Sequence, residues 1–174
     1  MAGTDVPIPG LDPTWPESRE IAVVIAQAAS PGWRRLAHDA AAAAQPGGHS
    51  FPLGEPTRSH DGAADDRTAF LYRHEDRIGG YLCLANRLIT GYRSPTTGYR
   101  PASDTERIIR PSILIVWVDT PLRSHGIARR LVIAAAQHAD VVPSALGWGE
   151  PFTDNGYLLA QSIAPVGLWI TDYS

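Results

Sequence analysis

The sequence contains no lysine, only one cysteine and no long apolar run, and each of these absences excludes a class of function. All fifteen basic side chains that carry a full charge at neutral pH are arginines, in a chain of 174 residues. A Walker A phosphate loop, a Schiff-base or pyridoxal site and a protein-kinase site each require a lysine. None of these three kinds of site is therefore expected.

The single cysteine, Cys83, has no second cysteine to pair with, which excludes a disulfide framework and a cysteine-rich zinc site. The six histidines include no closely spaced pair beside a carboxylate, so no metal site is predicted. The longest apolar runs, such as residues 113–118, fall far short of the ~20 residues that span a bilayer. We therefore expect a cytoplasmic protein without a membrane partner.

The net charge and the distribution of the arginines indicate which kind of ligand the protein binds. The formal net charge is −3, and the arginines are spread along the chain rather than gathered in one stripe. Proteins that bind nucleic acid usually show a basic patch, so nucleic acid is not expected as the main partner. A weakly acidic protein suits a cationic small molecule better.

The chain length fits one domain preceded by an arm. Four prolines in residues 1–16 predict an extended arm, which leaves residues 17–174 as a single domain. Thr14 and Glu17 form a capping-box pattern that predicts a helix continuing through Ala28. A second helix is predicted over residues 33–44.

The rest of the chain predicts a mixed sheet. A nearly continuous apolar run at residues 108–118 is typical of a strand buried on both faces, hence central in its sheet. Residues 91–106 contain Gly91-Tyr-Arg and Gly98-Tyr-Arg, and we interpret them as a long loop rather than as repeats. The resulting order of helices and strands predicts an α+β or three-layer α/β domain. The other expected strands are 68–74, 77–90, 144–148 and 167–172, and the other expected helices are 127–139 and 153–164.

The unit from strand 108–118 to helix 127–139 carries the strongest chemical signal. The first turn of a helix offers unpaired N–H groups and the positive end of the helix dipole, so a phosphate binds there readily. Gly126 allows backbone to approach a ligand, and Arg123, Arg129 and Arg130 supply positive charge. The pattern predicts an anion cradle built without lysine, although the same residues also suit a tight turn with a solvated helix end.

Residues 116–131, V-W-V-D-T-P-L-R-S-H-G-I-A-R-R-L, resemble motif A of the GNAT acetyltransferase superfamily, in which a hydrophobic strand leads through R/Q-x-x-G-x-G/A into a helix. The resemblance implies a mostly antiparallel mixed sheet with a splayed central strand, and acetyl-CoA as cosubstrate. It departs from the family at Ala128, where many members have glycine. By this resemblance, the strand end (Val116, Trp117, Val118) holds the pantetheine and acetyl oxygen, and the turn and helix start (Arg123, Ser124, His125, Gly126, Ile127, Ala128, Arg129) hold the pyrophosphate.

Two narrower resemblances concern the acceptor. Residues 148–160 look like the F-S-x-P-T-x-D-G-x-x-F-A segment of the cohesin acetyltransferases, with one residue more between proline and glycine. This chain lacks that family's paired cysteines and histidines for a zinc finger and the matching strand serine. Small antibiotic-modifying GNAT enzymes, such as the aminoglycoside N-acetyltransferases that act on kasugamycin, also suit a compact, slightly acidic chain.

An amine acceptor must lose a proton before it attacks, and the departing thiolate leaves more easily if it gains one. Asp154 is the first candidate for base or ammonium anchor, and Glu150 is the second. Tyr157 lies three residues after Asp154, on roughly the same helix face, and resembles the general-acid tyrosine of many GNAT enzymes. Structural roles compete: Asp154 also suits an N-cap, Tyr157 core packing and Glu150 an exposed loop.

We therefore expect an acetyl-CoA-dependent N-acetyltransferase that acts on a small-molecule amine, foremost an aminoglycoside-type antibiotic. A protein-lysine acetyltransferase related to the cohesin enzymes is the second interpretation. The third is a CoA-binding module without catalysis. The sequence leaves open whether the protein forms a homodimer.

Overall fold

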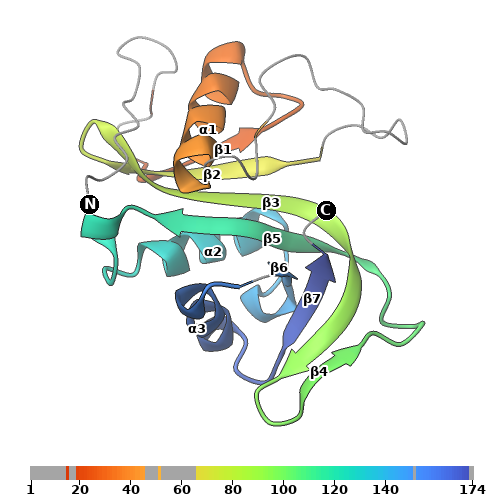
Figure 1. The fold of residues 1–174 in the computed structure, drawn as a ribbon. Helices are drawn as coiled ribbons and strands as arrows, with labels where there is room; N and C mark the ends of the chain where they lie inside the picture. Colours follow the sequence, from red (N-terminus) through yellow and green to blue (C-terminus); the bar gives the residue numbers. More distant parts are fainter. Residues whose placement is uncertain (1–14, 16–18, 46–50, 52–65, 151, 173–174) are drawn as a thin grey trace.

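The computed structural model describes residues 15, 19–45, 51, 66–150 and 152–172, and one seven-stranded sheet forms its centre (Figure 1). The strand order is β1-β2-β3-β5-β6-β7, with β4 paired to β3 alone. All neighbours are antiparallel except β5 with β6 and β6 with β7, which are parallel. The strands are β1 (Ile21–Ile25), β2 (Thr68–His74), β3 (Arg77–Ser94), β4 (Gly98–Pro101), β5 (Ile109–Val118), β6 (Gly147–Glu150) and β7 (Leu168–Asp172), and the helices are α1 (Pro31–Ala44), α2 (Ile127–His138) and α3 (Asp154–Ile163), with short 3₁₀ turns η1 (Thr120–Leu122) and η2 (Pro143–Ala145).

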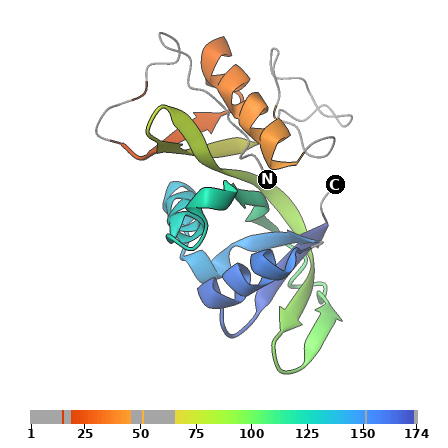
Figure 2. The same ribbon diagram turned by 60° about the vertical axis from the view of Figure 1, so that its left-hand side comes forward.

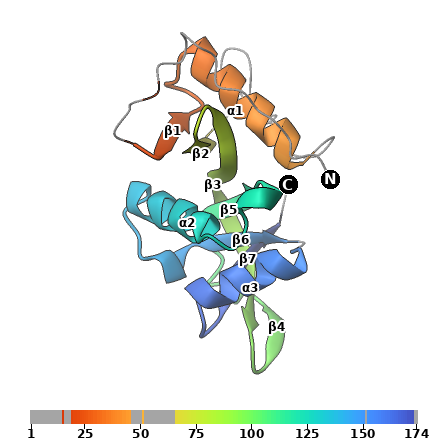
Figure 3. The ribbon, with the colours of Figure 1, turned by 90° about the vertical axis from the view of Figure 1, so that its left-hand side faces the viewer.

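Helices cover both faces of the sheet. In Figure 2 and Figure 3, α1 lies over one face near β1 and β2, and α2 and α3 lie on the other. Each side has its own apolar cluster: under α1, Leu36 of the helix and Tyr81 of the sheet are fully buried, and under α2, Leu131 of the helix and Phe70 of the sheet are fully buried. This arrangement confirms the predicted α+β, three-layer class with a mostly antiparallel sheet.

The helix predicted through Ala28 is wrong, because residues 21–25 form strand β1. Their burial alternates, with Ala22 and Val24 buried and Val23 exposed, as in a strand with one covered face. The apolar spacing fits a helical period as well, so the sequence alone does not distinguish the two. Antiparallel pairing with β2 decides in favour of the strand, and four of the five residues are β-branched.

The loop predicted over residues 91–106 is also wrong in its first part. Strand β3 continues to Ser94 and turns back through β4, with Gly98 at a φ of 77°. In this hairpin Tyr92 lies opposite Arg100, and Arg93 lies opposite Tyr99. The guanidinium carbons lie 5.1 Å and 5.6 Å from the facing ring centroids. The two Gly-Tyr-Arg copies are therefore cross-strand partners that stabilise each other by cation–π contacts.

The long strand β3 organises the C-terminal half of the sheet. Its first part pairs with β2 and β5, and its last part pairs with β4 and β7. The register shifts between Ile89 and Gly91, where the ring of Tyr99 occupies the space that a Cβ on Gly91 would need. The strand curves strongly along its length in Figure 1. This curvature lets β7 pair with both β3 and β6.

The other predicted elements are confirmed, with shifts of up to three residues at their ends, except that β3 extends four residues beyond the predicted end at Thr90. The predicted strand 144–148 divides into η2 and strand β6. The predicted arm lies outside the described residues except for Trp15, which is 6% exposed and whose ring centroid lies 5.5 Å from that of Trp33, with the planes tilted by 48°. The described helices include none that is long and apolar enough to span a membrane.

Candidate active site

The parallel strands β5 and β6 separate soon after they meet. They pair at only two positions, Ser112 with Gly147 and Ile113 with Trp148. Beyond these pairs β6 continues beside β7, while residues 114–118 of β5 continue beside β3 alone. The backbone of β5 that faces the diverging β6 therefore has no strand partner. This is the splayed central strand that the sequence predicted.

The predicted cofactor residues Val116, Trp117 and Val118 lie in the separated part of β5. Their side chains alternate between the two faces, since Val116 and Val118 pack in the cluster under α2 and Trp117 packs in the cluster under α1. The backbone polar groups where β5 separates from β6 are thus held in place by side chains that pack on both faces of the sheet. A group held this firmly can orient a ligand carbonyl without reorganising.

The loop between β5 and α2 exposes backbone amides. Ser124 has a φ of 66° and Gly126 a φ of 76°, so the chain turns sharply just before the helix. Among the hydrogen bonds of the described residues, the amides of Ser124, His125 and Gly126 have no acceptor. The amides of the first turn of α2 lack partners by helix geometry. Together these amides suit an anion, as the cradle interpretation requires.

The side chains of this loop are largely exposed but partly tied to it. Arg123 Nε donates to the Val118 carbonyl at 3.0 Å. His125 Nδ1 lies 2.9 Å and 3.1 Å from two loop carbonyls, so this nitrogen carries the proton and donates. The hydrogen bond of Arg123 and the contacts of His125 hold the loop against the end of β5.

The three nearby arginines have different surroundings. Arg130 pairs with Glu20 at 2.8 Å and lies over the Tyr72 ring, so it faces the β1–β2 side. Arg129 is exposed and has no ion-pair partner among the residues that the structure describes. Arg129 and Arg123 are therefore the guanidiniums left for an anion. Ile127 is buried and Ala128 half-buried, so these two residues offer mainly backbone groups.

Asp119 anchors this loop, and the sequence interpretation missed it. Its carboxylate is 1% exposed, accepts a hydrogen bond from the Thr120 amide at 2.9 Å and pairs with Arg77 at 2.7 Å. Its own amide donates to the Gly79 carbonyl at 2.9 Å. The run Asp-Thr-Pro after a strand is an N-cap signal that could have identified it.

Two glycines on β3 let this loop and α2 approach the sheet. The Leu122 side chain occupies the space that a Cβ on Gly79 would need. A Cβ on Gly80 would lie 3.1 Å from Leu131 and 3.2 Å from Ile127, tighter than ordinary contact. The glycine pair near the start of β3 therefore sets the depth of the cradle.

Glu150 lies at the end of β6 and is not a free loop acid. Its Oε1 accepts from Arg93 Nε at 3.0 Å and from the second guanidinium nitrogen at 2.6 Å. In the sheet register it lies beside Asp172 of β7. A carboxylate held by a guanidinium is better suited to positioning than to accepting a proton, so Glu150 is the weaker candidate base.

Asp154 is the first residue of α3 and is exposed, whereas the N-cap is Thr153. The Thr153 hydroxyl accepts from the Gly156 amide at 3.1 Å, which satisfies the cap. Asp154 is therefore not needed as the cap, and its carboxylate makes no hydrogen bond within the described part of the chain. Of the two candidate bases, Asp154 therefore makes fewer structural contacts than Glu150.

Tyr157 combines packing with a usable hydroxyl. Its ring lies 5.7 Å from that of Phe152 and contacts the cluster under α2. Its oxygen accepts from Gln161 Nε2 at 3.0 Å, which leaves its own proton free to be donated. The packing interpretation and the general-acid interpretation are thus both compatible with its surroundings.

Cradle and candidate acids lie at one edge of the sheet. Strands β5 and β6 run parallel, so their carboxyl ends point the same way, and α2 and α3 follow these ends. The loop at residues 123–126, Glu150 and the start of α3 therefore share that edge. Within the described residues no group of three or more histidine, cysteine or acidic side chains is arranged to hold a metal.

A mostly antiparallel sheet with helices on both faces and a splay between two parallel strands is the fold of GNAT-type acetyltransferase domains. Among solved structures, the xEco2 acetyltransferase domain bound to a K105-CoA conjugate is similar over 88% of this chain and 93% of that chain, with a TM-score of 0.60 and 17% identity. A second structure of the xEco2 acetyltransferase domain matches 62% of this chain and 70% of that chain, with a TM-score of 0.47 and 18% identity. No family model and no curated protein matches the sequence. The likeness to the first of these structures shows the fold.

Proposed function

We propose that the protein transfers the acetyl group of acetyl-CoA to an amine. The splay between β5 and β6, with the free amides of the loop at residues 123–126 beside it, carries this proposal. Support comes from the xEco2 domain, which has the same fold and is bound to a CoA conjugate. The amides at residues 124–129, with Arg123 and Arg129, would bind the pyrophosphate, and the free backbone at residues 116–118 would bind the pantetheine and the acetyl oxygen.

In the proposed reaction the amine nitrogen attacks the thioester carbonyl carbon, and the carbon–sulfur bond breaks. Asp154 accepts the proton that the amine loses, directly or through a water. Tyr157 donates its hydroxyl proton to the departing thiolate. Arg93 neutralises Glu150, so the neighbouring Asp172 of β7 is the acid that helps to attract the cationic acceptor. Every step uses side chains at the edge of the sheet where the cradle lies.

The acceptor is a cationic amine, and we propose an aminoglycoside-type antibiotic first. Asp154 and Asp172, which lie near the carboxyl ends of β6 and β7 and form no ion pair within the described residues, support a small polycation. A protein lysine is the second candidate, and the structure of the xEco2 domain favours it because that domain holds a K105-CoA conjugate. Sequence similarity between residues 148–160 and the cohesin acetyltransferases also favours the second candidate.

A thiol-release assay with acetyl-CoA tests the function, with aminoglycosides, polyamines and lysine peptides as separate acceptors. We expect turnover with one of these classes and a fall in kcat of about 10²–10⁴-fold for Asp154→Asn, the usual contribution of a general base. Asp39→Asn, an exposed acid in α1, is the matched control and should keep full activity.

The outcomes separate the alternatives. Turnover of lysine peptides alone would select the second acceptor. A rise in melting temperature with acetyl-CoA, without acetylation of any acceptor, would leave a CoA-binding module. Equal kcat for Asp154→Asn and the control would exclude Asp154 as the base.

A further inference from the structure

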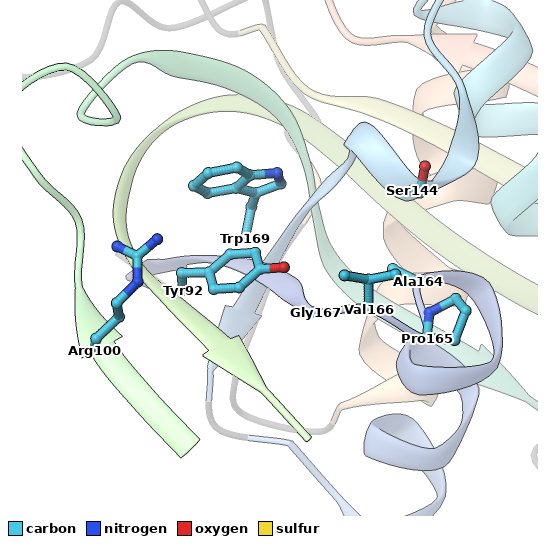
Figure 4. A pocket seen from close by; sticks show the side chains of 8 residues that line it. All are labelled: Tyr92, Arg100, Ser144, Ala164, Pro165, Val166, Gly167 and Trp169. Atoms are coloured by element: carbon cyan, nitrogen blue, oxygen red, sulfur yellow. The ribbon is translucent and has the colours of Figure 1, made fainter. Parts of the chain in front are cut away.

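A cavity of about 450 Å³ lies away from the candidate active site (Figure 4). Strands β5, β6 and β7 run parallel, and the cradle follows the carboxyl ends of β5 and β6. The cavity instead lies by the amino end of β7, the turn after α3 and the β3–β4 hairpin, so it is at the opposite edge of the sheet. Its walls include Tyr92, Arg100, Ser144, Pro165, Val166 and Trp169.

Two aromatic rings form a fixed wall of this cavity. The rings of Tyr92 and Trp169 pack edge to face, with centroids 4.8 Å apart and planes at 60°. The hydroxyl of Tyr92 occupies the space that a Cβ on Gly167 would need, so the turn after α3 closes directly on the ring. Val166, 81% exposed, forms an apolar rim in that turn. The two rings therefore present an apolar wall against which a flat apolar group can pack.

A guanidinium group lies over each of the two rings of this wall. The Arg100 guanidinium lies 5.1 Å from the centre of the Tyr92 ring, and that of Arg110 lies 4.7 Å from the centre of the Trp169 ring. Glu106 balances Arg100 through two hydrogen bonds of 2.7 Å and 2.8 Å. Arg110 has only a long contact of 3.4 Å to the Ala145 carbonyl.

Arg110 is the group that lacks a counter-charge. Its Nε is buried without a hydrogen-bond partner, and no carboxylate within the described ranges pairs with it. A half-buried guanidinium without a counter-ion is unfavourable, because its buried Nε has lost water without gaining an acceptor. The local charge next to Trp169 is therefore +1 once Glu106 has neutralised Arg100. An anion bound here would offset that charge.

We propose that this cavity is a binding site for a small aromatic carboxylate. The ring of the ligand would pack against Tyr92 and Trp169 beneath Val166. Its carboxylate would be attracted by Arg100, which lines the cavity, and by the charge of Arg110, whose guanidinium lies over the Trp169 ring. Ser144 also lines the cavity. The site is independent of the acetyl-transfer chemistry, since it shares no residue with the cradle.

Isothermal titration calorimetry on the full chain tests the site with three probes of nearly equal shape. These are 2-naphthoate, the neutral 2-naphthamide and the cationic 2-naphthylmethylamine. We expect saturable binding of the naphthoate, at least 10-fold tighter than that of the amide, and no binding of the amine. The same affinity is expected with and without saturating CoA.

Two variants and a control locate the binding. Val166→Glu places a carboxylate at the rim and should weaken naphthoate binding at least 10-fold, and Arg110→Gln should weaken it about as much. Val23→Glu, on a 43% exposed valine of β1, should leave binding unchanged. Equal affinity for naphthoate and naphthamide would overturn the proposal. So would competition with CoA, unchanged binding in Val166→Glu, or the absence of saturable naphthoate binding in the wild-type protein.

Discussion

Substitution of Asp119 by asparagine should destabilise the protein and weaken acetyl-CoA binding at the same time. The carboxylate is 1% exposed, whereas its partner Arg77 is 25% exposed. Breaking a fully buried ion pair costs about 3–5 kcal/mol, and an exposed pair is worth under about 1 kcal/mol. Because asparagine keeps an acceptor for the Thr120 amide, we expect an intermediate loss of about 1–2 kcal/mol.

For a chain of this length that loss corresponds to a fall in melting temperature of about 2–8 °C. Differential scanning calorimetry measures it, and a double-mutant cycle with Arg77→Met isolates the coupling between the two side chains. Glu20→Gln is the matched control, because the Glu20–Arg130 pair is 61% and 42% exposed and should contribute under about 1 kcal/mol.

The expected weaker binding of acetyl-CoA follows from the position of Asp119 at the start of the loop between β5 and α2. Asp119 fixes the end of β5 to Gly79 and starts the turn that presents the free amides. If the proposed cradle binds acetyl-CoA, Asp119→Asn should raise its KM several-fold and change kcat less. A melting temperature no lower than that of Glu20→Gln, or an unchanged KM, would refute the role of Asp119 as the anchor of the cradle.

Two further predictions concern charge. Hydrogen bonds from Arg100, and then from the Ser103 amide, lower the pKa of Glu106 to about 2. Because this folded-state pKa is depressed, the stabilisation that it reports is complete above the ordinary carboxyl pKa of about 4.3 and is lost as the pH falls through about 2. An NMR titration should find that midpoint, Arg100→Gln should move it toward about 4.3, and a wild-type midpoint near 4.3 would contradict the ion pair. Separately, a chain without lysine has no side-chain amine to acetylate. Long incubation with acetyl-CoA should therefore add at most one stable N-acetyl group by intact mass, at the N-terminal amine, and several such groups would contradict this.

The elements that sequence reasoning predicted well depend on local signals. The unit from β5 to α2 was predicted to within one residue at each end, because its strand is strongly apolar, and Gly126 and the apolar stripe mark the helix. Strand β1 and the β3–β4 hairpin were missed because pairing with distant segments decides them. Tyr92 and Arg100 stabilise each other only once the chain has turned back at Gly98.

The candidate site likewise contains some residues that local sequence predicts and others whose state depends on distant parts of the chain. The cradle residues are contiguous in sequence, so a motif can identify them. The state of Glu150 depends on Arg93, which lies 57 residues earlier, and no local pattern relates the two. The burial of Asp119 depends on Arg77 and Gly79 of a different strand. Residue types predicted the chemistry, and tertiary contacts decide which acid is free to perform it.

The separation of β5 from β6 has a structural cause that the uniformly apolar sequence of β5 does not reveal. The register of β5 against β3 shifts at Leu114, which is the extra residue of a β-bulge. Leu114 and the next residue, Ile115, both pack on the α1 side, whereas Ile113 and Val116 pack on the α2 side. Side chains of a regular strand alternate, so two consecutive residues on one side mark a local change of strand direction. This bulge lies where β5 leaves β6, and Ile-Leu-Ile-Val gives no sign of it because all four residues are apolar. The opening on which the proposed chemistry depends therefore arises from how β5 packs between its two helical layers.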